Sequence, residues 1–433
     1  MKIGLVSLGC SKNLIDTQNA LSFLKASGHV FVSDPKKADV IIVNTCGFIE
    51  SAKQESINTI LEMADYKQHR CKKLIAMGCL VQRYRRELEE ELPEVDRFIS
   101  IDEYRDMEKI LNETLASETI CQREIVLATE PYTSYLRIAD GCSNHCTFCA
   151  IPLIRGRYTS VPFEEVLENA RQLQAIGVKE LNIIAQDSTM YGKDLYGRLR
   201  LHELLIELNK MDFHWIRVLY MYPDEIYDGL LDSMASLKKV IPYFDIPSQH
   251  GSDRILKLMN RRGRKQDIQK TVRDIREKFA DPILRTTVIV GFPSETDEDF
   301  RQLMDLTEEI RWDRLGAFAY SREEGTGACR LPDQVDEKTA QKRLDELMQR
   351  QSQISLENNQ RYEERTIEVL VERKKSFNSP YYQGRGWMHA PDDIDGHVFF
   401  RSDQALEPGQ FVEVEIERAE MYDLFGREKR KEG

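Results

Sequence analysis

The sequence lacks the features that would place it among membrane, fibrous or repeat proteins. No apolar run approaches the roughly 20 residues of a membrane-spanning helix. Residues 1–9 form a short β-like run and not a signal peptide followed by a small-residue cleavage site. Low-complexity tracts and solenoid periods are also absent. The 433 residues therefore predict a globular protein of about three domains.

Basic residues are too few to balance the acidic ones. The chain has 61 Lys and Arg against 73 Asp and Glu, a net charge of −12. A protein that grips nucleic acid through its phosphates needs excess positive charge. The balance therefore disfavours a simple nucleic-acid binder and fits a basic partner better.

Nine cysteines are present without an export signal, so we expect reduced thiols in the cytoplasm with metal or catalytic roles. Cys142, Cys146 and Cys149 are spaced C-x3-C-x2-C, and no fourth cysteine lies nearby. Structural zinc prefers four protein ligands, whereas iron–sulfur clusters are held by thiolates. Three thiolates would leave one iron of a 4Fe–4S cluster free for another ligand. Zinc or chance clustering is the alternative.

The first 125 residues alternate between strand-like and helix-like stretches, which predicts a doubly wound parallel α/β sheet. The strands are expected at residues 2–8, 39–44 and 73–77, and the helices at about 16–26, 51–66 and 83–91. Cys10, Cys46 and Cys79 each follow one of these strands. Because parallel strands end at one edge of a sheet, the three thiols should converge and could hold a second cluster. Three buried core cysteines are the alternative.

Residues 131–362 contain six strand-like runs separated by helical stretches, which predicts a partial parallel (βα)6 barrel. The runs are 135–139, 180–185, 215–221, 243–246, 284–290 and 315–320. The Cys142 motif follows the first of them, at the face where barrel active sites lie. Gly291, after the fifth run, is expected to let the backbone approach a ligand closely. His250 receives no catalytic role.

Short strands at residues 366–371, 381–387, 397–401 and 410–417 predict a small OB-like β-barrel over residues 366–433. This segment holds 10 Lys and Arg against 14 Asp and Glu, a net charge of −4. An acidic barrel complements a basic protein better than a phosphate backbone. Solubility is the alternative reason for the charge.

Short motifs lie along the whole chain, at residues 8–14 with Asp16, 44–49 with 51–56, 78–79, 142–149 with 151–152 and 155–156, 291–293, and 320–321 with 325–326. Through these motifs the chain resembles the methylthiotransferase family of radical S-adenosylmethionine (SAM) enzymes. The resemblance comprises an N-terminal methylthiotransferase domain, a radical SAM core and a C-terminal TRAM domain. Phe148, just before Cys149, belongs to the radical SAM signature. The segments around Cys10 and Cys46 resemble the branch that modifies ribosomal protein S12.

The resemblance implies addition of a methylthio group to the β-carbon of an aspartate in S12, either free or assembled in the ribosome. One 4Fe–4S cluster on Cys142, Cys146 and Cys149, beside Phe148, would bind and cleave SAM. A second, on Cys10, Cys46 and Cys79, would hold the sulfur. No catalytic side chain beyond these ligands is expected. The implied electron donor is a flavodoxin or ferredoxin, and neither a membrane nor tRNA is an expected partner.

Two other functions remain open from the sequence. One is a tRNA methylthiotransferase acting on N6-isopentenyladenosine. The other is a non-catalytic iron–sulfur protein that binds RNA or senses redox state. A test for SAM cleavage would distinguish either enzyme from the non-catalytic iron–sulfur protein. Mass spectrometry of ribosomal protein and of tRNA would show which of the two enzymatic functions is correct.

Overall fold

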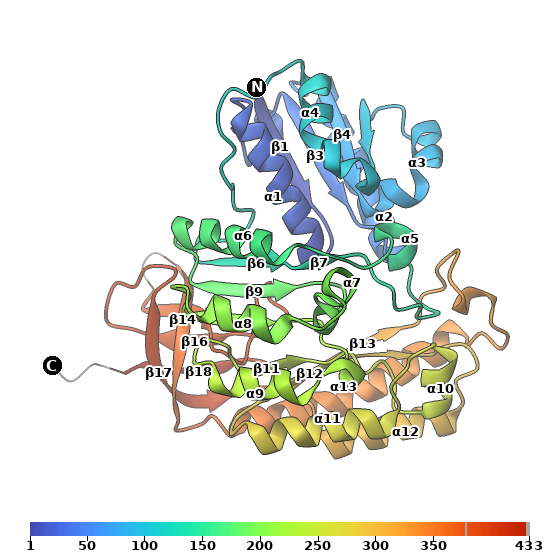
Figure 1. Cartoon of the computed structure of the whole chain (residues 1–433), viewed down its shortest axis with the longest axis vertical. Coiled ribbons are helices and arrows are strands. Elements are labelled where there is room, and N and C mark those ends of the chain that lie inside the picture. Colours follow the sequence, from blue (N-terminus) through green and yellow to red (C-terminus); the bar gives the residue numbers. More distant parts are fainter. Residues whose placement is uncertain (377–378, 430–433) are drawn as a thin grey trace.

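The computed structural model describes residues 1–376 and 379–429, which form three consecutive units (Figure 1). Arg430, Lys431 and Glu432, part of the tail charge count above, lie outside these residues. Among the described residues, no helix is both long and apolar enough to cross a membrane.

The N-terminal unit is a five-stranded, wholly parallel sheet in the order β2-β1-β3-β4-β5. Its strands are β1 (Lys2–Ser7), β2 (Val30–Phe31), β3 (Val40–Thr45), β4 (Lys73–Gly78) and β5 (Arg97–Ile99). Its helices are α1 (Ser11–Ala26), α2 (Glu50–Ala64), α3 (Cys79–Glu91) and α4 (Met107–Leu115). All six residues of the central strand β3 are buried, because separate apolar clusters cover both faces of the sheet. The predicted doubly wound sheet is confirmed.

Two helices begin earlier than the sequence predicted. Helix α1 starts at Ser11 rather than Asp16, and α3 starts at Cys79 rather than Arg83. The prediction was wrong because Ser11, Lys12 and Asn13 carry no amphipathic pattern, although all three are buried. They are buried because the first turn of α1 lies between the N-terminal unit and the central one.

The central unit is a partial barrel of six parallel strands flanked by helices. Two three-stranded sheets, β10-β9-β6 and β11-β12-β13, adjoin where Ile216 bridges Val240. The strands are β6 (Thr133–Arg137), β9 (Glu180–Ile184), β10 (Trp215–Val218), β11 (Tyr243–Asp245), β12 (Ile283–Val290) and β13 (Arg314–Ala319), with a small ribbon of β7 (Ala139–Asp140) and β8 (Thr159–Ser160). The helices are α5 (Ile151–Arg155), α6 (Phe163–Ile176), α7 (Lys193–Tyr196), α8 (Leu201–Asn209), α9 (Asp228–Ser236), α10 (Asp253–Leu258), α11 (Lys265–Lys278), α12 (Asp297–Ile310) and α13 (Glu337–Gln360).

The structure shows a packing role for Gly291, and the expected approach to a ligand stays a prediction. Gly291 has φ +69°, and a Cβ atom there would lie 2.4 Å from the Cβ of Ala340 in α13. The close approach that requires glycine is therefore to a helix of the same unit, and no ligand is needed to explain it.

The C-terminal unit is a closed five-stranded barrel in the order β14-β15-β16-β18-β17. Its strands are β14 (Thr366–Lys374), β15 (Tyr381–Arg385), β16 (Val398–Arg401), β17 (Phe411–Ala419) and β18 (Leu424–Glu428). Figure 1 shows this unit at the end of the central barrel where β6 and β9 begin. There Arg385 of β15 binds Glu180, the first residue of β9, with Nη2 and Oε2 2.6 Å apart. The predicted small C-terminal barrel is confirmed.

Candidate active site between two cysteine triads

The first predicted triad lies at the carboxyl ends of three adjacent strands, β1, β3 and β4. Cys10 caps α1, Cys46 follows β3, and Cys79 opens α3. A Cβ atom on Gly9 would lie 3.1 Å from the Cys46 sulfur, and one on Gly47 would lie 2.8 Å from the backbone nitrogen of Leu80. The three cysteine segments therefore touch one another in turn, as the strand-end argument predicted.

Asn13 connects these segments, a role that could not be predicted from its place in the motif of residues 8–14. Its Nδ2 donates to the carbonyls of Leu8 (3.0 Å) and Thr45 (2.9 Å). Its Oδ1 accepts from the Cys79 thiol (3.2 Å) and from Nη2 of Arg155 (2.9 Å). One fully buried amide thus contacts all three strand ends and the central unit.

The second predicted triad lies in the loop between β7 and α5. Backbone N–H groups point at two of its sulfurs: Asn144 N lies 3.4 Å from Cys142 Sγ, and Ile151 N lies 3.5 Å from Cys149 Sγ. The Arg261 guanidinium lies 3.9 Å from Cys146 Sγ. Such donors stabilise thiolates and orient metal ligands, so the surroundings suit a cluster.

Phe148, predicted to lie at the cofactor, is partly buried and packs against the cluster of Ile255, Met259 and Phe292. The remaining cysteines do not join either triad. Cys71 is buried in the N-terminal core, Cys121 is exposed, and Cys329 is half-buried. His250 is buried, and its Nδ1 accepts a hydrogen bond from the backbone of Ser252, which is a structural role.

Burial shapes the chemistry of both triads. It raises the pKa of Cys79 to about 12, against the opposing charge of Arg155. It also raises the pKa of Cys142 to about 11 and of Cys149 to about 12, and neighbouring thiols contribute to both shifts. A bound metal deprotonates such thiols and compensates their charge. Among residues 1–376 and 379–429, no three Cys, His, Asp or Glu side chains already form a metal-binding arrangement.

The two triads are packed close to each other through helix α5. Cys79 packs against Ala150 and Ile154, and Ala150 directly follows Cys149. Arg155 is the last residue of α5, the helix that contains Ile154. It contacts Asp16 of α1, with Nη2 and Oδ2 2.7 Å apart, and its guanidinium lies 3.8 Å from Cys79 Sγ. Figure 1 shows α5 against the N-terminal unit. The loop of one triad is therefore packed onto a residue of the other.

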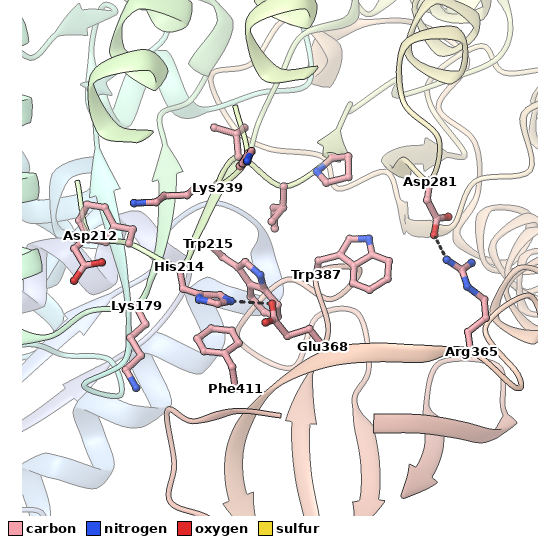
Figure 2. A pocket seen from close by; sticks show the side chains of 15 residues that line it. Lys179, Asp212, His214, Trp215, Lys239, Asp281, Arg365, Glu368, Trp387 and Phe411 are labelled. Carbon is pink, nitrogen blue, oxygen red and sulfur yellow. Dashed lines mark hydrogen bonds and ion pairs between the residues drawn. The ribbon is translucent and has the colours of Figure 1, made fainter. Parts of the chain in front are cut away.

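Two cavities at opposite ends of the central barrel are candidate substrate sites. One of about 280 Å³ lies beside Cys146 and is lined by Asn144, Tyr222 and Arg261, among others. A larger one, of about 900 Å³, lies at the other end of the barrel, against the C-terminal unit (Figure 2). There His214 contacts Glu368 (2.8 Å) and Arg365 contacts Asp281 (2.9 Å). Because barrel chemistry takes place at the carboxyl ends of the strands, the cysteine end is the candidate active site despite its smaller cavity.

Each of the three units matches the model of a known protein family or domain. The chain matches the models of uncharacterized protein family UPF0004 over residues 2–100, of the Radical SAM superfamily over 136–307 and of the TRAM domain over 365–428. The structure of the radical SAM methyltransferase TsrM from Kitasatospora setae is similar in fold, with a TM-score of 0.57 and 13% identity over 73% of this chain and 74% of that one. Fold and sequence together define a radical SAM enzyme, a class that uses an iron–sulfur cluster and SAM.

Relatives with curated names show to which family of radical SAM enzymes the chain belongs. The ribosomal protein uS12 methylthiotransferase RimO of Clostridioides difficile (strain 630) is 48% identical over 98% of both chains. That of Alkaliphilus oremlandii (strain OhILAs) is 46% identical, also over 98% of both chains. The chain belongs to this family of radical SAM methylthiotransferases.

Proposed function

We propose that this enzyme adds a methylthio group to the β-carbon of an aspartate in ribosomal protein S12. Two 4Fe–4S clusters would take part, one on Cys142, Cys146 and Cys149 and one on Cys10, Cys46 and Cys79. The domain limits proposed with this function are 1–125, 131–362 and 366–433. The observation that carries the proposal is the contact of Cys79 with Ala150, because it brings a sulfur-holding site next to a SAM-cleaving one.

The cluster on Cys142, Cys146 and Cys149 would supply one-electron reductive cleavage of SAM, and hence hydrogen abstraction from the substrate. The residues of the chain serve this chemistry by orientation. Arg261 and the backbone of Asn144 and Ile151 hold the thiolates, while Asn13 and Arg155 fix Cys79 opposite them. Positioning of this kind is the protein's share of the catalysis.

The electron donor we propose is a small acidic redox protein such as flavodoxin or ferredoxin. Residues 257–265 carry five cations and no acid in a chain whose net charge is −12. This segment holds the cluster loop: Asn260 Nδ2 donates to the His145 carbonyl (2.7 Å), and Thr147 N donates to the Met259 carbonyl (3.0 Å). Arg262 pairs with Asp224 and Glu225, but Lys257 and Arg264 are exposed and form no ion pair within the described residues. These two cations would steer an acidic donor toward the loop.

Ribosomal protein rather than tRNA is the proposed macromolecular partner. Glu413, Glu415 and Glu417 alternate along β17 with buried Val414 and Ile416, so all three carboxylates face solvent. This acidic row suits a basic protein and repels phosphates.

One experiment decides between the two enzymatic functions. The reconstituted enzyme is given ribosomal protein S12 and tRNA that carries N6-isopentenyladenosine without a methylthio group, together with SAM and a reductant, and both are analysed by mass spectrometry. We expect a methylthio adduct on one aspartate of S12 and none on tRNA. A peptide deuterated at that β-carbon should give deuterated 5′-deoxyadenosine. Modified tRNA with unmodified S12 would contradict the proposal.

A further inference from the structure

Lys12, in the first turn of α1, is a buried cation without an acidic partner. The residue is 3% exposed, and its Nζ lies 2.9 Å from the centroid of the Tyr220 ring. Within the described parts of the chain, no carboxylate or other acceptor contacts this ammonium. A buried ammonium ordinarily acquires a counter-charge, as Lys53 does from Glu50 and Glu323. An aromatic face compensates it only in part.

Tyr220 is held in an unusual backbone conformation beneath this ammonium. It follows β10 with φ +61°, in the left-handed region that bulky residues avoid. Its N–H donates to Oδ2 of Asp245 (2.9 Å), and the N–H of Met221 donates to the Asp245 carbonyl (2.8 Å). Neighbouring strands thus impose the conformation, and such imposed conformations concentrate at functional sites.

The place of Lys12 connects the two halves of the candidate site. It lies two residues after Cys10, and the adjacent Leu14 and Ile15 pack with Tyr135 and Leu219 of the barrel. Tyr220 itself lies at the carboxyl end of β10. The ammonium therefore lies where α1, two residues beyond the first cysteine triad, meets the carboxyl end of β10.

We propose that Lys12 is a specificity-determining residue that binds the side-chain carboxylate of the target aspartate. This inference rests on the function proposed above. A carboxylate supplies the counter-charge that Lys12 lacks, through a charge-assisted hydrogen bond. Because the β-carbon is bonded directly to that carboxylate, holding the carboxylate also places the carbon that loses hydrogen. An asparagine or alanine at the target position would leave the ammonium unpaired.

The test is a binding measurement on the reconstituted full-length enzyme. Dissociation constants are measured by fluorescence anisotropy for S12 peptides with Asp or Asn at the target position. The wild type should prefer the Asp peptide about 10- to 100-fold, the range of one hydrogen bond between charged groups. Lys12→Met, similar in length but uncharged, should lose this preference and bind the Asn peptide as the wild type does. Lys12→Arg should retain most of it.

SAM also carries a carboxylate, so its affinity is measured for the same variants. Unchanged SAM affinity in Lys12→Met is expected. Loss of SAM binding with the peptide preference intact would overturn the assignment, and so would an unchanged preference for Asp. Should Lys12→Met fail to fold, Lys12→Gln gives the same comparison. If the proposed function were wrong, the wild type would leave S12 unmodified in the mass-spectrometric assay. That result is distinct from any outcome that concerns Lys12 alone.

Discussion

Arg155 of α5 and Asp16 of α1 form an ion pair in which both side chains are almost fully buried, at 1% and 0% exposure. The same carboxylate also binds Arg137, with Nη1 and Oδ1 2.6 Å apart. Arg155 further contacts Asp140 (3.1 Å). The network crosses from the N-terminal unit to the central one, so it fixes how the two cysteine triads face each other.

Removing Arg155 should destabilise the protein strongly, because it leaves the buried carboxylate of Asp16 with only one of its two arginines. For Arg155→Met we expect a loss of about 3–5 kcal/mol in the free energy of unfolding, measured by urea denaturation of the metal-free protein. Arg86→Ala breaks an exposed pair with Glu90 and should cost less than about 1 kcal/mol. Equal, small effects of the two substitutions would contradict the argument.

The two triads should bind iron independently. Anaerobic reconstitution should give about eight irons per chain, two four-iron clusters. Replacing Cys142, Cys146 and Cys149 by Ala should halve the iron and abolish SAM cleavage. Replacing Cys10, Cys46 and Cys79 should also halve it while 5′-deoxyadenosine still forms. Replacing Cys71, Cys121 and Cys329 is the matched control and should leave the iron unchanged. Full iron in the second variant would disprove ligation by the strand-end cysteines.

Glu180 should make stability depend on pH in the acid range. Burial opposes its ionisation, but Arg385 and Arg217 outweigh burial and lower its pKa from 4.5 to about 2. A lowered pKa in the folded state stabilises the protein above pH 4.5, and the stabilisation disappears as the pH falls toward 2. The shift corresponds to roughly 3 kcal/mol at neutral pH.

In urea denaturation of the metal-free protein, the difference in unfolding free energy between the wild type and Glu180→Gln should therefore shrink from pH 6 to pH 3. A difference that stays constant over this range would show that Glu180 does not titrate as proposed.

Charge reversal in the basic segment should slow reduction by a protein donor. Lys257 and Arg264 are exposed and, within the described residues, form no ion pair. Lys257→Glu combined with Arg264→Glu should lower the rate of reduction by photoreduced flavodoxin about tenfold at low salt, and added salt should diminish the difference. Reduction by dithionite should not slow. The control reverses Lys36 and Lys72, exposed at the amino ends of the N-terminal strands. Equal slowing in both variants would argue against docking at this segment.

The acidic row of β17 should govern binding of ribosomal protein. Replacing Glu413, Glu415 and Glu417 by Lys in the full-length chain should weaken binding of S12 at low salt, mainly through a slower association rate. The same replacement of Glu87, Glu90 and Glu91, exposed on α3, is the control. Tight, salt-sensitive tRNA binding by the unchanged enzyme would count against the proposed partner.

The sequence was most informative where chemistry depends on local spacing. The motif from Cys142 to Cys149 and the three strand-end cysteines could be found because each is a short pattern placed after a buried strand. Arg155 could not be assigned, since its partner Asp16 lies 139 residues away. The role of Lys12 was equally hidden, because its ring partner belongs to another unit. Contacts between distant segments leave no periodicity to detect.

The C-terminal unit also has a consequence for synthesis of the chain. Glu180 obtains its counter-ion from Arg385, and Tyr243 donates to Asp395, so the central barrel is completed by residues that are made after it. During translation, the barrel would emerge with a buried carboxylate still lacking one of its two arginines. We therefore expect the nascent central unit to remain open until the C-terminal unit has been made and can pack against it, so that the closure of the barrel waits for a later part of the chain.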